Sequence, residues 1–138
     1  MPEIKKIHHI ALLVEDMDAA VKFWQETLGI APSHVSDMPS EAARIAFLPL
    51  GESEIELVQP TNADSGLSRY LEKHGPGMHH VCLGVDDLAG LLSLLKSKGI
   101  QLINDEPKAG EDGRLYAFIH PKSTYGVLIE LYELPTND

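Results

Sequence analysis

Residues 7–14 form an apolar stretch that contains two histidines, and a segment with a different hydrophobic pattern follows it. A short apolar run of this length predicts a strand. From Met17 to Leu28 the apolar residues recur at helical spacing, with Asp16 as the expected N-cap and Gly29 as the expected helix stop. The first part of the chain is therefore expected to form a strand followed by an amphipathic helix.

This strand and helix pattern occurs twice. The segment "IHHIALLVEDMDAAVKFWQETLGI" (7–30) resembles "MHHVCLGVDDLAGLLSLLKSKGI" (78–100), and His9 matches His80 at an offset of 71 (80 − 9). Further matches at this offset are Ile10 with Val81, Leu12 with Leu83, Val14 with Val85 and Asp16 with Asp87. The repeat predicts two half-domains of similar structure.

The second copy carries the same helix signals as the first. Asp86 or Asp87 is the expected N-cap, leucines form an apolar stripe, and Gly99 ends the pattern. Downstream, each copy ends in another strand, "SEIELVQ" in the first and "GVLIELYEL" in the second. Glu56 and Glu130 hold corresponding places in these two strands.

The repeat predicts that each half consists of a strand, a helix and then several strands. We expect one domain, 1–138, with internal modules 4–60 and 78–135 joined by the connector 61–77, which carries one short helical pattern. Two segments rich in Pro, Gly, Ser and charge are expected to be loops that lead into strands: 31–44 and 104–114.

The alternation of side chains along a strand distinguishes the four histidines of the two copies. The face with bulky aliphatic residues should lie under the following helix, and it includes His8 in the first copy and His79 in the second. His9 and His80 lie on the other face, among smaller residues that suit the wall of a cleft. This parity selects His9 and His80 as the candidate functional pair.

If the halves pair about a pseudo-twofold axis, His9 and His80 come together, and so do Glu56 and Glu130. Two imidazoles and two carboxylates would form a divalent-metal site and would explain the acidic residue in the apolar strand around Glu130. The competing interpretation is a hydrogen-bonded core histidine and a solvent-facing glutamate, but recurrence at matching positions favours the metal site. Other residues are expected as surface, loop or solvated groups: His34, His74, His120, Glu52, Glu54 and Glu133.

Composition limits the classes of partner. Eleven Lys and Arg against 21 Asp and Glu give a net charge of −10, which argues against a nucleic-acid or anionic-membrane surface. Cys82 is the single cysteine, so an internal disulfide is excluded and a reducing compartment is favoured. No signal-peptide pattern or 18-residue apolar span is present, so we expect a cytoplasmic protein.

The blocks "GESEIELVQP", "GPGMHHVCLGVDDL", "DEPK" and "FIHPKSTYGVLIELYE" resemble the vicinal oxygen chelate superfamily and, within it, the epimerases that act on methylmalonyl-CoA. The resemblance covers residues 4–133. It implies an α+β, glyoxalase-like fold in which two paired βαβββ modules form a curved mixed sheet with a metal-binding cleft. It also implies an acyl-CoA substrate and a homodimer. It also implies a divalent metal, with cobalt favoured and nickel, zinc or manganese as alternatives, held by His9, Glu56, His80 and Glu130. The second of these positions is Gln or Glu in similar epimerases.

The activity implied by the resemblance is epimerisation of (2R)- and (2S)-methylmalonyl-CoA through removal of the C2 proton and a metal-stabilised enolate. Protons then move on opposite faces, so two proton-transfer groups are expected. One is Glu130 and the other is a glutamate before the "AFLPLG" strand. The family spacing, counted back from Ala46, falls on Ser40 rather than Glu41, and a one-residue slip reverses a strand face unless a bulge or loop intervenes. Glu41 is our candidate base.

The loop that enters the last strand supplies the expected substrate contacts, Lys122 and Ser123. Tyr125 stands in this loop where the family generally has a small residue, so its ring could reshape the substrate pocket. A strongly basic groove for CoA is not visible in the sequence.

Three alternatives use the same type of fold. A glyoxalase I-like isomerase, acting on a hemithioacetal, would use the same two histidines and two glutamates. An extradiol-type dioxygenase would use two histidines and one glutamate on Fe(II), and a fourth ligand weighs against it. A metal-free small-molecule-binding module would need none of these ligands.

Overall fold

The computed structural model describes residues 1–136, which divide into two compact units. The N-terminal unit is His9–His79, and the C-terminal unit combines Met1–His8 with the residues from His80 onward. The eight strands have the hydrogen-bonded order β2-β3-β4-β1-β5-β8-β7-β6, with both parallel and antiparallel neighbours. The expected α+β class with a mixed sheet is confirmed.

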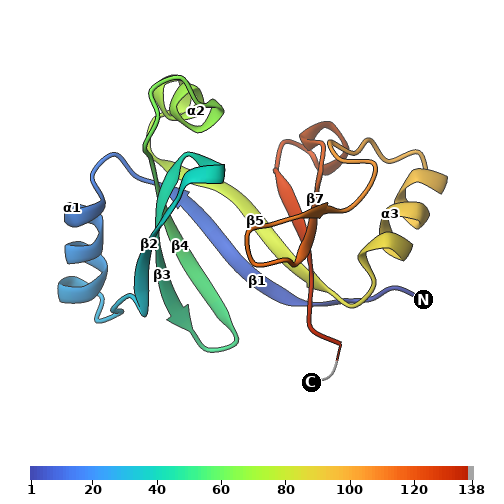
Figure 1. The fold of residues 1–138 in the computed structure, drawn as a ribbon, viewed down its shortest axis with the longest axis horizontal. Helices are drawn as coiled ribbons and strands as arrows, with labels where there is room; N and C mark the ends of the chain where they lie inside the picture. Colours follow the sequence, from blue (N-terminus) through green and yellow to red (C-terminus); the bar gives the residue numbers. More distant parts are fainter. Residues whose placement is uncertain (137–138) are drawn as a thin grey trace. The chain divides into compact units, whose positions relative to one another are not determined.

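The N-terminal unit contains most of the first copy of the repeat and the connector helix (Figure 1). Strand β4 runs parallel to β1, and β3 runs antiparallel to both β2 and β4. The elements of this part of the chain are β1 (Ile4–Leu13, of which residues 9–13 belong to this unit), α1 (Met17–Lys22), β2 (His34–Met38), the 3₁₀ turn η2 (Pro39–Glu41), β3 (Ala43–Leu50), β4 (Ser53–Pro60) and α2 (Gly66–His74).

The C-terminal unit follows the same plan. Strand β8 runs parallel to β5 and antiparallel to β7, which in turn pairs with the short β6. The elements are β5 (Gly77–Val85, of which residues 80–85 belong to this unit), α3 (Leu88–Ser97), β6 (Lys108–Ala109), β7 (Leu115–Ile119), the 3₁₀ turn η3 (Pro121–Thr124) and β8 (Ile129–Glu133).

Helices α1 and α3 begin with equivalent N-caps. The Asp16 carboxylate accepts a hydrogen bond from the N–H of Ala19 at 3.1 Å, and the Asp87 carboxylate accepts one from the N–H of Gly90 at 3.0 Å. Asp87 rather than Asp86 is therefore the cap of α3. The helical segments end before glycines with positive φ, as the sequence predicted.

A second acceptor at each helix start comes from the last strand of the same unit. Gln59 Oε1 accepts from the N–H of Met17 at 2.6 Å, and Glu133 Oε1 accepts from the N–H of Leu88 at 3.1 Å. Glu133 was expected to be a solvated charge, and that expectation is wrong. The error arose because the strand pattern of β8 does not show which helix terminus its last residue meets.

The first helix contains a wider turn that the second lacks. Helix α1 continues as the π-helical turn η1, Phe23–Thr27, in which the N–H of Leu28 donates to the carbonyl of Phe23 at 3.3 Å. From N-cap to stop glycine the first helical segment spans 13 positions (29 − 16) and the second spans 12 (99 − 87). The π-helical turn accommodates the one additional residue.

The aliphatic faces of β1 and β5 pack under the helices, as strand parity predicted. Leu12 and Val14 pack in one cluster with the apolar side of α1, and Leu83 packs with α3 around the buried Leu88 and Leu92. In the N-terminal unit the opposite face of β1 is also covered, because Leu67, Tyr70 and Leu71 of α2 pack against its buried cluster.

Two segments expected to be loops contain short strands. Residues 31–44 include β2 and the turn η2, and residues 104–114 include β6. Both strands pair along one side only; β2 is mostly polar, and β6 has only two residues. Their hydrogen bonds to β3 and β7 therefore favour the extended conformation more than any apolar alternation in their own sequence. None of the helices in residues 1–136 is long and apolar enough to cross a membrane.

Candidate metal-binding site

In the N-terminal unit, parallel pairing of β1 and β4 brings His9 to Glu56. Ala11 is directly opposite Glu56, so His9, two residues before Ala11, projects from the same face. His9 Nδ1 lies 3.3 Å from Glu56 Oε2, and the two side chains are only 8% and 11% exposed.

The C-terminal unit repeats this arrangement with β5 and β8. Cys82 is directly opposite Glu130, and His80 lies two residues before Cys82 on the same face. His80 Nε2 lies 3.0 Å from Glu130 Oε1, and each side chain is 13% exposed. The diagonal register is therefore identical in the two units.

Each unit thus holds one histidine ring nitrogen against one carboxylate in a nearly dry environment. A carboxylate removed from water requires a hydrogen bond, an ionic partner or a metal. Imidazole nitrogen and carboxylate oxygen are ligands for divalent transition metals. Each pair supplies two of the four donors that the sequence analysis selected, and the chemistry of each pair fits a divalent cation.

A phenylalanine lies directly opposite each glutamate. Phe47 pairs with Glu56 across β3 and β4, and Phe118 pairs with Glu130 across β7 and β8. Phe118 also presents its ring to His80, with centroids 5.6 Å apart and an interplanar angle of 85°. The sequence analysis missed this pair, although the two phenylalanines are separated by 71 positions (118 − 47), the offset of the histidines.

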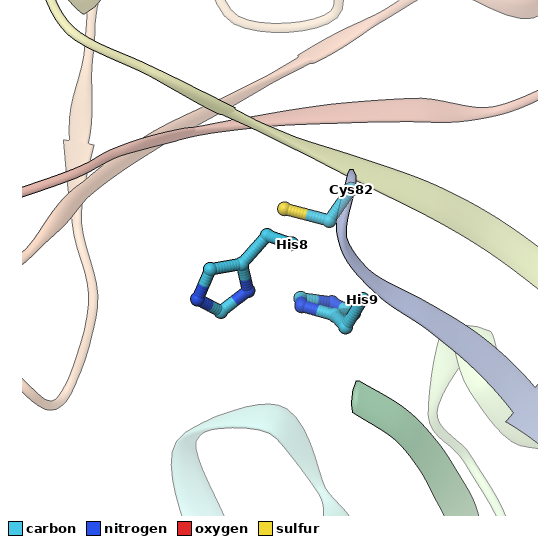
Figure 2. Close-up of side chains that lie close together, drawn as sticks. All are labelled: His8, His9 and Cys82. Carbon is cyan, nitrogen blue, oxygen red and sulfur yellow. The ribbon is translucent and has the colours of Figure 1, made fainter. Parts of the chain in front are cut away.

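His8 and His79, which strand parity did not select as candidate ligands, have aromatic neighbours. His79 makes an edge contact with Tyr70 of α2, and His8 packs on Tyr132 with ring centroids 4.6 Å apart. Figure 2 shows the His8 ring and the Cys82 side chain, on the neighbouring strands β1 and β5, together with His9, the next residue of β1. Packing roles for His8 and His79 account for these contacts.

Glu41, the candidate base, is exposed and ends the 3₁₀ turn η2. The next residue, Ala42, has a left-handed backbone with φ of 52°, and β3 begins directly after it. Glu41 lies one residue from the family position, and such a shift reverses the strand face unless the alternation is interrupted. The turn η2 interrupts it, because the residues before Ala42 do not continue the pleat of β3. Ser40, at the family spacing, is also exposed.

The expected substrate-contact residues lie in η3. Lys122 is exposed, whereas the Ser123 hydroxyl accepts a hydrogen bond from the N–H of Gln101 at 2.9 Å. The turn is closed by further bonds, including Lys122 N–H to His120 Nδ1 at 3.0 Å. Tyr125 follows it with φ of 58° and a fully exposed side chain. Ser123 thus anchors the turn, and Lys122 is presented to solvent.

Two surface hollows of about 320 and 500 Å³ lie in the N-terminal unit, at the start of α1 and beside α2. They share Glu15 and Gln59, and neither is lined by His9 or Glu56. The first is largely acidic, and Arg44 at its edge is paired with Asp37 at 3.0 Å. We place the candidate chemistry at the His–Glu pairs, because the hollows bring together no comparable set of ligands.

Comparison with known proteins gives a consistent result. Residues 8–118 match the family model of the Glyoxalase/Bleomycin resistance protein/Dioxygenase superfamily. The mitochondrial methylmalonyl-CoA epimerase of Mus musculus is 36% identical over 130 residues, covering 94% of this chain and 73% of that protein. The ethylmalonyl-CoA/methylmalonyl-CoA epimerase of Cereibacter sphaeroides is 33% identical over 95% of this chain and 99% of its own.

A solved structure of a Streptomyces coelicolor methylmalonyl-CoA epimerase variant, in complex with 2-nitronate-propionyl-CoA, has a TM-score of 0.87 and 33% identity. The match covers 95% of both chains. Together with the family match and the repeated His–Glu pairs, this shows that the chain belongs to the Glyoxalase/Bleomycin resistance protein/Dioxygenase superfamily, with methylmalonyl-CoA epimerases among its similar relatives.

Proposed function

We propose that this protein epimerises C2 of a branched malonyl-CoA thioester, with methylmalonyl-CoA as the leading substrate, and that it requires a divalent metal. The observation that carries the proposal is the recurrence of one His–Glu pair with side chains at most 13% exposed, in identical diagonal register, in each unit. Similarity to methylmalonyl-CoA epimerases along nearly the whole chain supports the choice of reaction.

His9, Glu56, His80 and Glu130 are the proposed metal ligands. Such a cation, when bound, supplies Lewis-acid stabilisation of negative charge on the oxygens of the substrate. Cobalt is the favoured metal by resemblance, and nickel, zinc and manganese suit the same mixture of nitrogen and oxygen donors. The low exposure of both pairs supports the proposal, because removal of water strengthens electrostatic stabilisation.

Glu130 is the proposed proton-transfer group on one face of the substrate. The C2–H bond lies between a thioester carbonyl and a carboxylate, so the electron pair left behind is delocalised onto oxygen when the proton moves to a Glu130 oxygen. Reprotonation from the same face regenerates the starting enantiomer. Inversion therefore needs a second acid on the opposite face.

Glu41 is the proposed second group. Glu41 precedes the left-handed Ala42 and is outside β3, so the alternation of side chains along that strand does not fix the direction of its side chain. Lys122 is proposed to contact the substrate carboxylate or a CoA phosphate from the exposed side of η3, where a flexible ammonium group suits an anion. Ser123 is proposed to contribute by holding that turn through its bond to Gln101. A homodimer is proposed as the assembly, and light scattering of the purified protein measures it.

The deciding experiment follows C2 exchange in deuterated water. Metal-free protein is loaded with Co²⁺ and incubated with (2R)-methylmalonyl-CoA, and the substrate is analysed by NMR and by chiral assay. Deuterium at C2 together with loss of stereochemistry supports the proposal. No exchange, combined with turnover of a hemithioacetal, would instead indicate the glyoxalase I-like reaction.

Single variants then separate the roles of the residues. Glu41→Gln should abolish inversion but leave C2 exchange measurable for the enantiomer whose C2 proton faces Glu130, so both enantiomers are assayed. Ser40→Ala should be nearly unchanged. Glu130→Gln should lose both exchange and metal affinity. If Ser40→Ala, and not Glu41→Gln, stops inversion, then the assignment of Glu41 is wrong while the epimerase reaction stands.

A further inference from the structure

The two units carry equivalent faces that are covered differently. In the N-terminal unit, the cross-strand pair next to Glu56 is Ile45 opposite Val58, which are 3% and 6% exposed and lie under α2. The corresponding pair in the C-terminal unit is Tyr116 opposite Tyr132, and both are half-buried. Helix α2 follows β4, whereas no helix follows the corresponding strand β8 within residues 1–136.

Tyr132 is fixed at both ends of its side chain. Its hydroxyl donates to the Asp112 carboxylate, and its ring packs against His8 with an interplanar angle of 46°. Asp112 is itself held at the tip of the β6–β7 connection, where its other oxygen accepts from the N–H of Arg114 at 2.9 Å. The phenol ring therefore has one preferred orientation.

That orientation matters because of the distance from Glu130. Tyr132 and Glu130 are two residues apart in β8 and project from the same face, which places their side chains about 7 Å apart. A carbon atom that exchanges a proton with Glu130 lies about 3 Å from the carboxylate oxygen. An alkyl branch on that carbon, directed along β8, would reach the phenol ring.

We propose that Tyr132, oriented by Asp112, is the residue that limits the size of the C2 substituent accepted by the enzyme. This inference rests on the proposed function. The ring offers a flat apolar surface that suits a methyl group, and each further methylene must displace it. Asp112 acts as a positioning residue, because it touches the ring's hydroxyl rather than the substrate.

The test compares kcat/KM for methylmalonyl-CoA, ethylmalonyl-CoA and propylmalonyl-CoA in metal-loaded wild type and variants. Tyr132→Ala should raise the ethyl-to-methyl ratio by about 10-fold or more, the range that one methylene contributes to selectivity. Tyr132→Phe and Asp112→Asn retain the ring but weaken the tether, and both should raise the ratio by a smaller factor. The matched control is Val58→Ala, at the equivalent position under α2, which should leave the ratio unchanged.

The outcomes separate this inference from the proposed function. If wild type exchanges no malonyl thioester at C2, the proposed function fails. If wild type is active and every Tyr132 and Asp112 variant changes the three rates by one common factor, this inference alone is overturned. Should Tyr132→Ala fail to fold, Tyr132→Phe and Asp112→Asn still decide the question, because the predicted change is in a ratio and not in total activity.

Discussion

Replacing Glu133 with leucine should destabilise the C-terminal unit through the start of α3. The Glu133 carboxylate accepts the N–H of Leu88, the first residue of that helix, at 3.1 Å. Leu88 has no exposed surface, so water cannot easily replace the lost acceptor. The variant would also remove a negative charge from the positive end of the helix.

The magnitude follows from these two contributions. A hydrogen bond to a charged group contributes about 1.5–3 kcal/mol, and the helix dipole adds about 0.3–1 kcal/mol where the group is partly exposed. Because Glu133 is half-buried, we expect a loss of about 2 kcal/mol for Glu133→Leu. For 138 residues the unfolding entropy is about 0.29 kcal/mol/K, so Tm should fall by about 7 °C.

Urea denaturation followed by circular dichroism measures this difference. Glu133→Gln keeps an acceptor and should lose less than about 1 kcal/mol. Gln59→Leu removes the equivalent but uncharged acceptor for the N–H of Met17 and should cost about 1 kcal/mol. Glu111→Leu, at an exposed loop position in the same unit, is the matched control for loss of a carboxylate.

The reasoning is refuted if Glu133→Leu has the same midpoint as Glu111→Leu while the m-value is unchanged. It is also refuted if Gln59→Leu costs more than Glu133→Leu, because the charged acceptor should contribute more. A changed m-value would show that the variant alters the surface exposed on unfolding or departs from two-state behaviour, and the comparison would then use Tm in place of the urea midpoint.

The remaining predictions concern metal, pH and backbone conformation. Adding Co²⁺ at about 100 times its Kd should stabilise the metal-free protein by about 2.7 kcal/mol. The variant His80→Ala should lose most of this stabilisation. Thermal unfolding with and without chelator measures both effects. Burial, followed by the hydrogen bond to Asp112, raises the pKa of Tyr132 above its ordinary value of 10.0, so the neutral phenol contributes stability that is fully present below pH 10 and is lost as pH rises further. Wild type should therefore lose more stability between pH 9 and 11 than Tyr132→Phe, and equal losses would contradict this. Gly99, with φ of 76°, should tolerate alanine poorly, with a loss of about 1 kcal/mol, whereas Ser97→Ala at the end of α3 serves as the helical control.

The internal repeat made much of the fold predictable from the sequence. Matching His9 with His80 and Asp16 with Asp87 located both strands, both caps and both helices, because two similar segments are expected to adopt the same backbone conformation. Strand parity also predicted which faces of β1 and β5 pack under the helices. These features depend on local periodicity, which the sequence displays directly.

Features that depend on contacts between distant segments were less accessible. The role of Glu133 required knowledge of which helix meets the end of β8, and the short strands β2 and β6 form because of their partners. Phe47 and Phe118 were overlooked because an apolar residue inside a strand suggests packing alone. The sequence of the connector did not predict that α2 covers the face of the N-terminal unit that carries Glu56. The apolar edge of this helix could pack on any exposed apolar surface.

The π-helical turn at Phe23–Thr27 has a consequence for how the two halves have diverged in length. An insertion placed inside the helix leaves the capped first turn and the terminal Gly29 in their own conformations, so no neighbouring strand has to shift. Each added helical residue rotates the following side chains by about 100°. Phe23 and Leu28, at the two ends of this turn, are 51% and 49% exposed. Deleting one residue of this turn should restore an ordinary α-helix and return the two halves to equal helix lengths.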